Sequence, residues 1–429
     1  MQKTWLRYLT CPTCDYAMDV VVDGESVSEN LGFGKVACAC REYPVVAGIL
    51  IIDHPSKEKI THCLDKGSVR GALKAAFELK DNKPKHLWNT PYSAPHFNAL
   101  LYYLSRFKRL SLSTILSTST YLKINKNWAN YLKYRFASTS FLAAFPLMEW
   151  ARRRHLASYP ILDYCCGTGN ACFYLSLLFP GCPLFCLDLN FTNLFIAHKY
   201  ICPGAFFMQM DASKPLPFSS GTLDGVFSTD ALHYLPDKAL AAREIHRCLT
   251  SGGWAILSHN HNVNVPQSHD LGTALTIDGY ISLFENYFDI ALYNEFNLIK
   301  DGLIGRKILR QSPKSSLEAE EAFSMFLKKN TVVAKDIESN AMGDIDVTDW
   351  DFCPPLAWGK WRLNPLYRPR KHKQGLQLAR RFPSHKYEEE YKALKTLFPE
   401  EGYLPQEWEK QAEEYWRRGF VSFVPHFFE

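Results

Sequence analysis

Residues 158–300 alternate short apolar runs with segments of helical spacing, and this alternation constrains the fold more than any other feature. Four apolar runs predict strands: Ile161–Cys165, Leu184–Leu189, Gly225–Thr229 and Trp254–Ser258. Three segments between them predict helices: Asn170–Phe179, Phe191–Tyr200 and Lys238–Cys248. Strands and helices in turn are typical of an α/β domain with a doubly wound, mainly parallel sheet.

The first of these strands leads into a glycine turn. Asp163 lies near the end of the strand, and Gly167 and Gly169 follow before the helix. Glycine is needed there because a side chain would keep a cofactor from lying against the backbone. A dinucleotide loop has a third glycine where this chain has Cys172, and a carboxylate beside the turn would repel a pyrophosphate. The turn therefore favours S-adenosylmethionine, which is cationic and has no phosphate.

Two further acids follow later strands. Asp188 ends the second apolar run, where an acid accepts hydrogen bonds from ribose hydroxyls. Asp211 precedes Ala212. We expect Asp211 to hydrogen-bond the adenine amino group and Ala212 to leave room for the ring.

The motifs continue in a fixed order along the chain: Leu-Asp-x-x-Cys-Gly-Thr-Gly at 162–169, Leu-Pro-Phe at 216–218, Thr-Leu-Asp-Gly-Val-Phe-Ser at 222–228, Ala-Leu-His-Tyr-Leu-Pro at 231–236, and Arg-Cys-Leu-Thr-Ser-Gly-Gly at 247–253. Over residues 158–262 this series resembles the class I S-adenosylmethionine-dependent methyltransferases, in particular the branch that methylates small molecules. The resemblance implies a Rossmann-like fold with the cofactor held by Asp163, Gly167, Gly169, Asp188, Leu189, Asp211, Ala212 and Thr229. That family usually has glycine where this chain has Cys165, so a narrowed or degenerate pocket is the alternative.

Polar residues after the later strands are the candidates for chemistry, because open α/β sheets bind ligands at the carboxyl ends of their strands. We expect Asp230, His233 and His259 to be catalytic, with His261 nearby. A general base is needed only when the acceptor carries a proton. Structural packing of His233 and polar loop roles for the other histidines are the alternatives. The Asn/Asp-Pro-Pro-Tyr/Phe tetrapeptide is absent after Phe227, which argues against adenine or glutamine amino groups as acceptors.

A cysteine cluster near the start of the chain predicts a structural zinc site. Cys11 and Cys14 form a Cys-x-x-Cys pair, and Cys38 and Cys40 follow as Cys-x-Cys. Four thiolates on two turns suit tetrahedral zinc and leave no open position for catalysis. The segment resembles the small zinc-ribbon proteins that activate tRNA and protein methyltransferases. The residues that carry this resemblance are Leu-Thr-Cys-Pro-Thr-Cys at 9–14 and Tyr-Pro-Val-Val-Ala-Gly-Ile at 43–49. Unrelated free thiols are the alternative.

The chain divides into four predicted parts: a zinc ribbon at 1–54, a helical linker or lid at 55–155, the S-adenosylmethionine-binding domain at 156–300, and a mostly helical extension at 301–429. Helical spacing recurs at Glu318–Lys329, Lys386–Leu397 and Glu407–Arg418. The nine other cysteines sit mostly in apolar segments and are expected to be buried and unreactive.

We expect an enzyme that methylates oxygen, nitrogen or carbon of a small-molecule acceptor. The second alternative is an RNA or protein methyltransferase that binds a macromolecule through the zinc ribbon and a basic run, residues 368–373. The third alternative is a non-catalytic binding module. The longest apolar stretches are too short for a membrane helix, and residues 1–10 have no signal-peptide core. A cytoplasmic location without membrane attachment is therefore expected.

Overall fold

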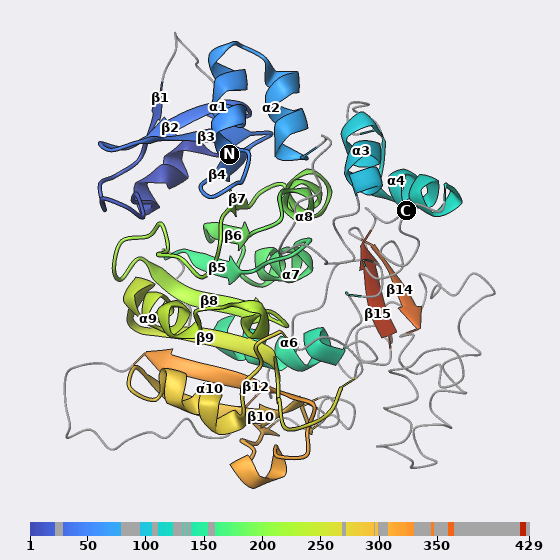
Figure 1. Cartoon of the computed structure of the whole chain (residues 1–429). Coiled ribbons are helices and arrows are strands. Elements are labelled where there is room, and N and C mark those ends of the chain that lie inside the picture. Colours follow the sequence, from blue (N-terminus) through green and yellow to red (C-terminus); the bar gives the residue numbers. More distant parts are fainter. Residues whose placement is uncertain are drawn as a thin grey trace.

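The computed structural model describes residues 1–21, 29–78, 95–104, 110–122, 132, 135, 139–152, 159–267, 272–295, 297–298, 308–329, 345–346, 359–363 and 421–425. Within them, an eleven-stranded sheet has the order β1-β2-β3-β4-β7-β6-β5-β8-β9-β12-β10 (Figure 1). Its strands are β1 (Asp19–Val21), β2 (Gly34–Ala37), β3 (Glu42–Val46), β4 (Ile49–Ile51), β5 (Ile161–Tyr164), β6 (Leu184–Asp188), β7 (Phe206–Gln209), β8 (Leu223–Thr229), β9 (Leu249–His261), β10 (Phe288–Asn294) and β12 (Ala322–Lys329). Two small antiparallel pairs are β11 (Ile308–Leu309) with β13 (Ile345–Asp346), and β14 (Gly359–Leu363) with β15 (Val421–Pro425).

The middle of the large sheet is parallel. β5 lies between β6 and β8, with Ile161 opposite Leu184 on one side and opposite Gly225 on the other. β12 runs antiparallel to both β9 and β10. A parallel sheet whose order reverses at β5 is a doubly wound Rossmann-like fold, which confirms the predicted fold class.

The cysteine-containing segment continues this sheet. β1, β2, β3 and β4 pair antiparallel in sequence, and β4 then pairs parallel with β7, placing Ile49 opposite Phe207. Figure 1 shows these strands as one edge of the sheet. Two segments more than 150 residues apart therefore share one ladder of backbone hydrogen bonds.

Helices cover both faces of the sheet. Successive residues of a strand point to opposite faces, and here both faces carry apolar side chains that the helices bury. Ile161 belongs to one buried cluster and Leu162 to the other. The first cluster receives residues from α1 (Lys57–Asp65), α2 (Val69–Ala76), α3 (Pro95–Leu104), α4 (Leu112–Tyr121), α6 (Thr139–Arg152), α7 (Asn170–Leu178), α8 (Phe191–Ile196) and the π-helical turn η2 (Ala197–Ile201). The second receives residues from η1 (Lys3–Tyr8), η3 (Leu232–Tyr234), α9 (Lys238–Cys248) and α10 (Ile277–Phe284).

One predicted helix is wrong. The segment Glu318–Lys329 holds strand β12, preceded by the short 3-10 turn η4 (Lys314–Ser316). Six consecutive residues of β12 are buried, so the strand lacks the apolar–polar alternation that marks a half-buried strand. In the part of 301–429 that is described, the regular elements are strands and η4, not the expected helices. The segments 368–373, Lys386–Leu397 and Glu407–Arg418 lie outside the described residues.

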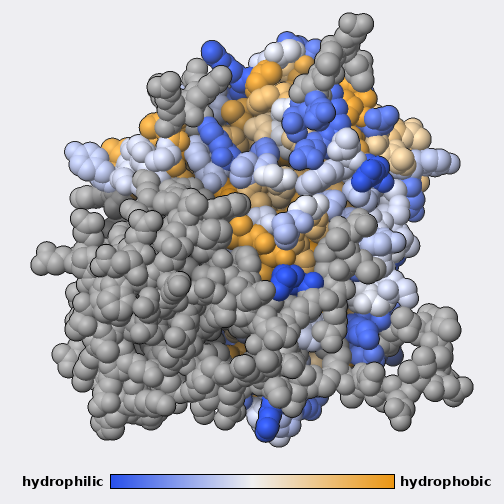
Figure 2. All heavy atoms as spheres, turned by 180° about the vertical axis from the view of Figure 1, so that it is seen from behind, coloured by the Kyte–Doolittle hydropathy of each residue, from blue (hydrophilic) through white to orange (hydrophobic). Residues whose placement is uncertain are grey.

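The division at residues 54, 155 and 300 stays a prediction, but one sheet joins three of the four predicted parts: β4 of the first part pairs with β7 of the third, and β12 of the last part pairs with β9 of the third. Seen from behind, the described surface mixes hydrophilic residues with an apolar area near its middle (Figure 2). Among the described helices, none is long and apolar enough to cross a membrane.

Candidate active site

The glycine turn after β5 has a left-handed backbone at three positions. Gly167 has φ +55° and Gly169, the N-cap residue of α7, has φ +80°. A Cβ on Gly169 would lie 2.8 Å from the Cβ of Ala197, so glycine lets α7 approach η2. A Cβ on Gly167 would meet no atom within 4 Å, so this side of the turn is open. Cys165 adopts φ +61° although it carries a side chain, a conformation that costs energy.

Asp163 is buried beneath this turn. It is 1% exposed, and its Oδ2 atom has no hydrogen-bond partner among the described residues. Burial raises the pKa of Asp163 well above its usual value, and a hydrogen bond from the backbone of Cys172 opposes this only in part. An unsatisfied buried carboxylate oxygen is costly, so it marks a position where a donor or cation would be stabilised.

Asp188 joins the end of β6 to the glycine turn. Its Oδ2 accepts a hydrogen bond from the Gly167 N–H at 2.9 Å, and its Oδ1 accepts one from the Asn190 N–H at 2.8 Å. Burial raises the pKa of Asp188, opposed by these backbone hydrogen bonds. The carboxylate is thus held at the carboxyl edge of the sheet beside Leu189, which is partly buried.

Asp211 and Ala212 follow β7 at the same edge. The Oδ1 atom of Asp211 accepts a hydrogen bond from the Ser213 N–H at 2.9 Å. Ala212 is 5% exposed, and its carbonyl accepts a hydrogen bond from the Tyr164 hydroxyl. Thr229 ends β8, so all eight predicted cofactor positions lie in or after the ends of β5, β6, β7 and β8, which are neighbours in the sheet.

Three histidines gather around Asp230, one in η3 after β8 and two at the end of β9. The His261 ring lies 4.4 Å from the His233 ring and 4.8 Å from the His259 ring, centroid to centroid. Asp230 accepts a hydrogen bond from Arg135 Nη1 at Oδ2, 2.8 Å away, and its Oδ1 lies 3.1 Å from His261 Nε2. Burial would raise the pKa of Asp230, but Arg135 and the histidines outweigh it and hold that pKa well below its usual range. The structure therefore brings together all three predicted catalytic residues.

The His259 ring is oriented by an acid that the sequence analysis missed. Glu295, one residue after β10 and 4% exposed, accepts hydrogen bonds from the His259 N–H and from its Nδ1, both at 2.7 Å. Ser324 of β12 donates a third hydrogen bond to Glu295 at 2.9 Å. Burial alone would lower the pKa of His259, but the charge of Glu295 outweighs it and raises that pKa.

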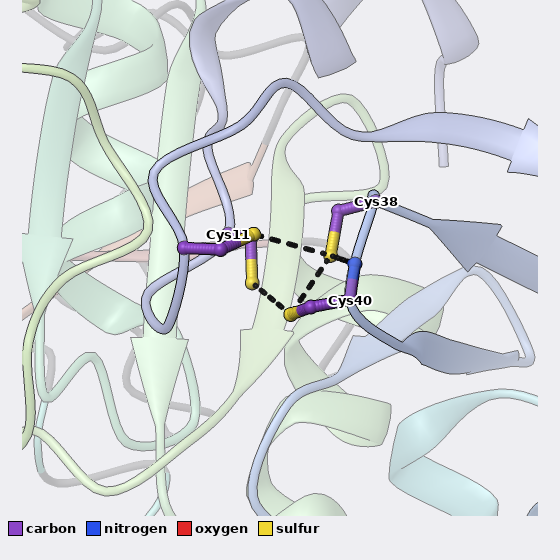
Figure 3. Close-up of side chains that lie close together, drawn as sticks. Cys11, Cys38 and Cys40 are labelled. Atoms are coloured by element: carbon purple, nitrogen blue, oxygen red, sulfur yellow. Dashed lines mark hydrogen bonds between the residues drawn. The ribbon is translucent and has the colours of Figure 1, made fainter.

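The four predicted metal-ligating cysteines also converge. The sulfur atoms of Cys38 and Cys40 are 3.5 Å apart, those of Cys11 and Cys40 are 3.6 Å apart, and those of Cys14 and Cys38 are 3.8 Å apart. Figure 3 shows the sulfurs of Cys11, Cys38 and Cys40 pointing toward one another. Four thiolates at about 2.3 Å from a tetrahedral zinc ion lie roughly 3.8 Å apart, so the donor set fits zinc.

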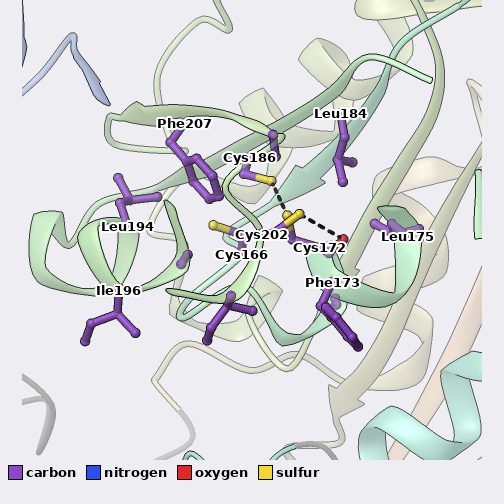
Figure 4. Packing of buried hydrophobic residues seen from close by; sticks show 14 of the residues in the cluster. Cys166, Cys172, Phe173, Leu175, Leu184, Cys186, Leu194, Ile196, Cys202 and Phe207 are labelled. Carbon is purple, nitrogen blue, oxygen red and sulfur yellow. Dashed lines mark hydrogen bonds between the residues drawn. The ribbon is translucent and has the colours of Figure 1, made fainter. Parts of the chain in front are cut away.

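Most other cysteines are core residues, as expected. Cys166, Cys172, Cys186 and Cys202 are at most 5% exposed and pack among apolar side chains such as Phe207 (Figure 4). The Cys186 thiol donates to the Cys172 sulfur at 3.1 Å. Cys248 is also buried, whereas Cys63, Cys165 and Cys182 are half-buried; Cys353 lies outside the described residues.

Comparison with known proteins identifies the segment that contains the glycine turn. Residues 162–257 match the family model for the methyltransferase domain. The match runs from β5 to β9, which is less than a quarter of the chain, and includes Asp163, Asp188, Asp211 and Asp230. The coarser prediction, a class I methyltransferase domain, is thereby supported.

Two curated relatives are trans-aconitate 2-methyltransferases, from Acidovorax sp. (strain JS42) and Acidovorax ebreus (strain TPSY). Each is 32% identical over 145 residues, which is 34% of this chain and 54% of the relative. The chain thus spans about half the length of the curated relatives it matches.

Solved methyltransferase structures are also similar. One from Mesorhizobium loti is 19% identical and covers 44% of this chain and 98% of that chain, with a TM-score of 0.33. A possible histamine N-methyltransferase from Thermotoga maritima is 16% identical and covers 50% of this chain and 100% of that chain, with a TM-score of 0.32. The fold assignment rests on the strand order of this chain itself.

Proposed function

We propose that this chain is an S-adenosylmethionine-dependent methyltransferase that transfers the methyl group to oxygen, nitrogen or carbon of a small molecule. The observation that carries the proposal is the match of residues 162–257 to the methyltransferase domain, with a glycine turn tied to Asp188 inside it. A turn of this kind at the carboxyl end of the first strand of the domain is where open α/β sheets bind cofactors.

The residues present fit the cofactor. Gly167 leaves space beside the backbone. The Oδ2 atom of buried Asp163, which has no hydrogen-bond partner within the described part of the chain, offers an acceptor that suits a cationic ligand. Asp188 keeps lone pairs for ribose hydroxyls after binding two backbone N–H groups, and Asp211 and Ala212 would border the adenine. When bound, S-adenosylmethionine supplies a methyl group already activated by the sulfonium, so the protein's main task is alignment.

The His259–Glu295 pair would remove a proton from an acceptor that carries one. The Glu295 carboxylate accepts from Nδ1–H and so leaves Nε2 as the nitrogen that takes the proton. The His259 side chain is 22% exposed, whereas Glu295 is buried behind it, so the ring is the member of the pair that an acceptor can reach. Asp230 lies beside this pair and is proposed to help position the acceptor.

A small carboxylic acid is the first acceptor to assay. The curated relatives are named for methylating trans-aconitate, which supports a small-molecule acceptor over a polymer. We further propose that residues 1–54 form a zinc ribbon in which Cys11, Cys14, Cys38 and Cys40 hold a structural ion. Because β4 pairs with β7, this ribbon would stabilise the edge of the catalytic sheet.

The function is tested by methyl transfer from S-adenosylmethionine labelled in its methyl group. Purified protein is incubated with trans-aconitate, with other small di- and tricarboxylic acids, and separately with RNA. Label in a small-molecule product supports the proposal, and label only in RNA contradicts the acceptor class. The Asp188→Ala variant should transfer less label at limiting S-adenosylmethionine in every reaction, with the exposed Asp289→Ala variant as a matched control.

A further inference from the structure

The Asp230 cluster contains a donor set that methyl transfer itself does not explain. One ligand atom from each of Asp230, His233 and His261 lies within 4.8 Å of the other two. The three residues come from the loop after β8, from η3 and from the end of β9, and both histidines are buried, at 0% and 2% exposed. Two imidazoles and one carboxylate around one point are a ligand set of transition-metal sites.

The hydrogen bonds of Gln267 determine which nitrogen of His261 carries a proton. The Gln267 side-chain amide donates from Nε2 to the Glu321 carbonyl at 2.8 Å, and a carbonyl can only accept. Its Oε1 therefore faces His261 Nδ1, 2.8 Å away, and accepts the Nδ1–H. Nε2 then faces Asp230 Oδ1, 3.1 Å away, and in the neutral ring it presents a lone pair to that oxygen.

Two acceptors facing each other at this distance need a positive species between them. A second ring proton is one solution, and a metal ion is the other. The metal ion also takes in a third donor, because the perpendicular His233 ring lies 4.4 Å from the His261 ring and offers a ligand atom within 4.8 Å of those of Asp230 and His261. An ion roughly 2.0–2.2 Å from both His261 Nε2 and Asp230 Oδ1 would leave those atoms about 3.0–3.5 Å apart, which includes the observed spacing.

The groups around these three residues orient them as the outer partners of metal ligands do. Gln267 orients His261 from behind, as outer partners of metal-bound histidines do. Arg135 occupies Oδ2 of Asp230 and leaves Oδ1 for a single bond to an ion. The buried Glu295 carboxylate, bonded to His259, adds negative charge to the same edge of the sheet.

The geometry points to a binding site for one divalent first-row transition-metal ion, such as Zn²⁺, Fe²⁺, Mn²⁺ or Co²⁺, held by Asp230, His233 and His261. Three protein ligands leave positions open for water. An oxygen atom of the methyl acceptor would take one of these positions. This part of the proposal rests on the proposed function.

The test is a titration of the full chain, with its cysteine site already filled by zinc, using Co²⁺. Binding is followed by calorimetry and by visible absorption. We expect one further equivalent of Co²⁺ per chain, with ligand-field bands but without the intense near-ultraviolet charge-transfer absorption that thiolate ligands give. The Asp230→Asn and His261→Gln variants should bind this equivalent at least tenfold more weakly, whereas His62→Gln, an exposed histidine, should bind it like the natural chain.

Absence of the further equivalent in the natural chain would overturn the proposal, and so would its undiminished binding by Asp230→Asn. Far-ultraviolet circular dichroism and retention of the cysteine-bound zinc establish that each variant is folded. Should His261→Gln fail to fold, Asp230→Asn, which keeps the side-chain size, decides. Because metal binding is read without turnover, its failure is distinct from failure of methyl transfer, which the labelled-methyl assay reports.

Discussion

Glu295 accepts hydrogen bonds from both the backbone N–H and the ring Nδ1 of His259, each 2.7 Å long. His259 has a left-handed backbone, with φ +59°, just past the end of the pairing with β8 and at the register shift between β9 and β12. The double contact fixes the ring and its proton position in a conformation that a non-glycine residue seldom adopts.

Replacing Glu295 by Gln keeps the shape of the side chain but removes the charge that orients and supports the His259 ring. For an acceptor that carries a proton, we expect turnover to fall roughly 10- to 100-fold, a part of the roughly 10²- to 10⁴-fold that a positioned base contributes. Cofactor affinity should stay unchanged. Steady-state kinetics beside Glu285→Gln, an exposed control, measure the effect; equal turnover in both variants would remove His259 from the chemistry.

Cys11→Ser removes one of the four converging thiols. We expect loss of bound zinc and a fall in stability of about 2 kcal/mol or more, which lowers the melting temperature by roughly 4–8 °C. The loss should spread into the sheet, because β4 pairs with β7. Metal analysis and thermal unfolding are compared with Cys63→Ser, a half-buried cysteine outside the cluster. Finding no zinc in the natural chain would contradict the ribbon.

Cys165 combines two opposing effects in the glycine turn. Its left-handed backbone, φ +61°, costs about 1–2 kcal/mol, while its side chain packs against the second core cluster. Cys165→Gly should therefore change the free energy of unfolding by less than about 1 kcal/mol. Cys165→Val should lower it by more than about 2 kcal/mol, because a branched side chain is strained there. Denaturant unfolding checks both values, and a harmless Val would show that the turn is not strained.

His54 should make stability depend on pH. Its Nε2 donates to the Ala76 carbonyl and its Nδ1 accepts from the Ser56 N–H, so the neutral ring is the form that fits. Burial lowers the pKa of His54 to about 4. The hydrogen bond to the Ala76 carbonyl and the charge of Asp53 would each raise this pKa, but burial outweighs them. The neutral ring therefore contributes up to about 3 kcal/mol to the free energy of unfolding. This contribution is complete above about pH 6.5 and is lost as the pH falls toward 4.

His54→Gln removes this titration. The free energy of unfolding, measured from pH 7.5 to 4, should therefore fall less steeply in this variant than in the natural chain. The exposed His62→Gln should keep the original slope. Identical slopes in all three proteins would mean that the His54 ring is protonated as easily in the folded chain as in the unfolded one.

The sequence predicted the elements whose signals are local. The bounds of α9, Lys238–Cys248, agree with the prediction, and β5, the glycine turn and α7 follow the glycine spacing. β12 was missed because burial on both faces removed its alternation, while its Ala, Met, Leu and Lys residues favour a helix. Local sequence signals carried no information about its place between β9 and β10.

Only those site residues that directly follow a predicted strand could be placed from the sequence. Asp188 and Asp211 each follow a strand, so their edge of the sheet could be inferred. Glu295 lies 36 residues from His259, and Arg135 lies 95 residues from Asp230. Such pairs depend on the register of β10 and on the packing of the helical region before β5, neither of which leaves a pattern in the sequence.

Isothermal titration of the purified chain with S-adenosylmethionine shows whether the cofactor binds beside the glycine turn. We expect saturable binding of one equivalent. Binding should be weaker by about 1–3 kcal/mol in Asp188→Ala, the loss expected for hydrogen bonds to a buried polar partner, and unchanged in Asp289→Ala. A titration that shows neither heat nor saturation, or an Asp188→Ala variant that binds as tightly as the natural chain, would contradict this expectation.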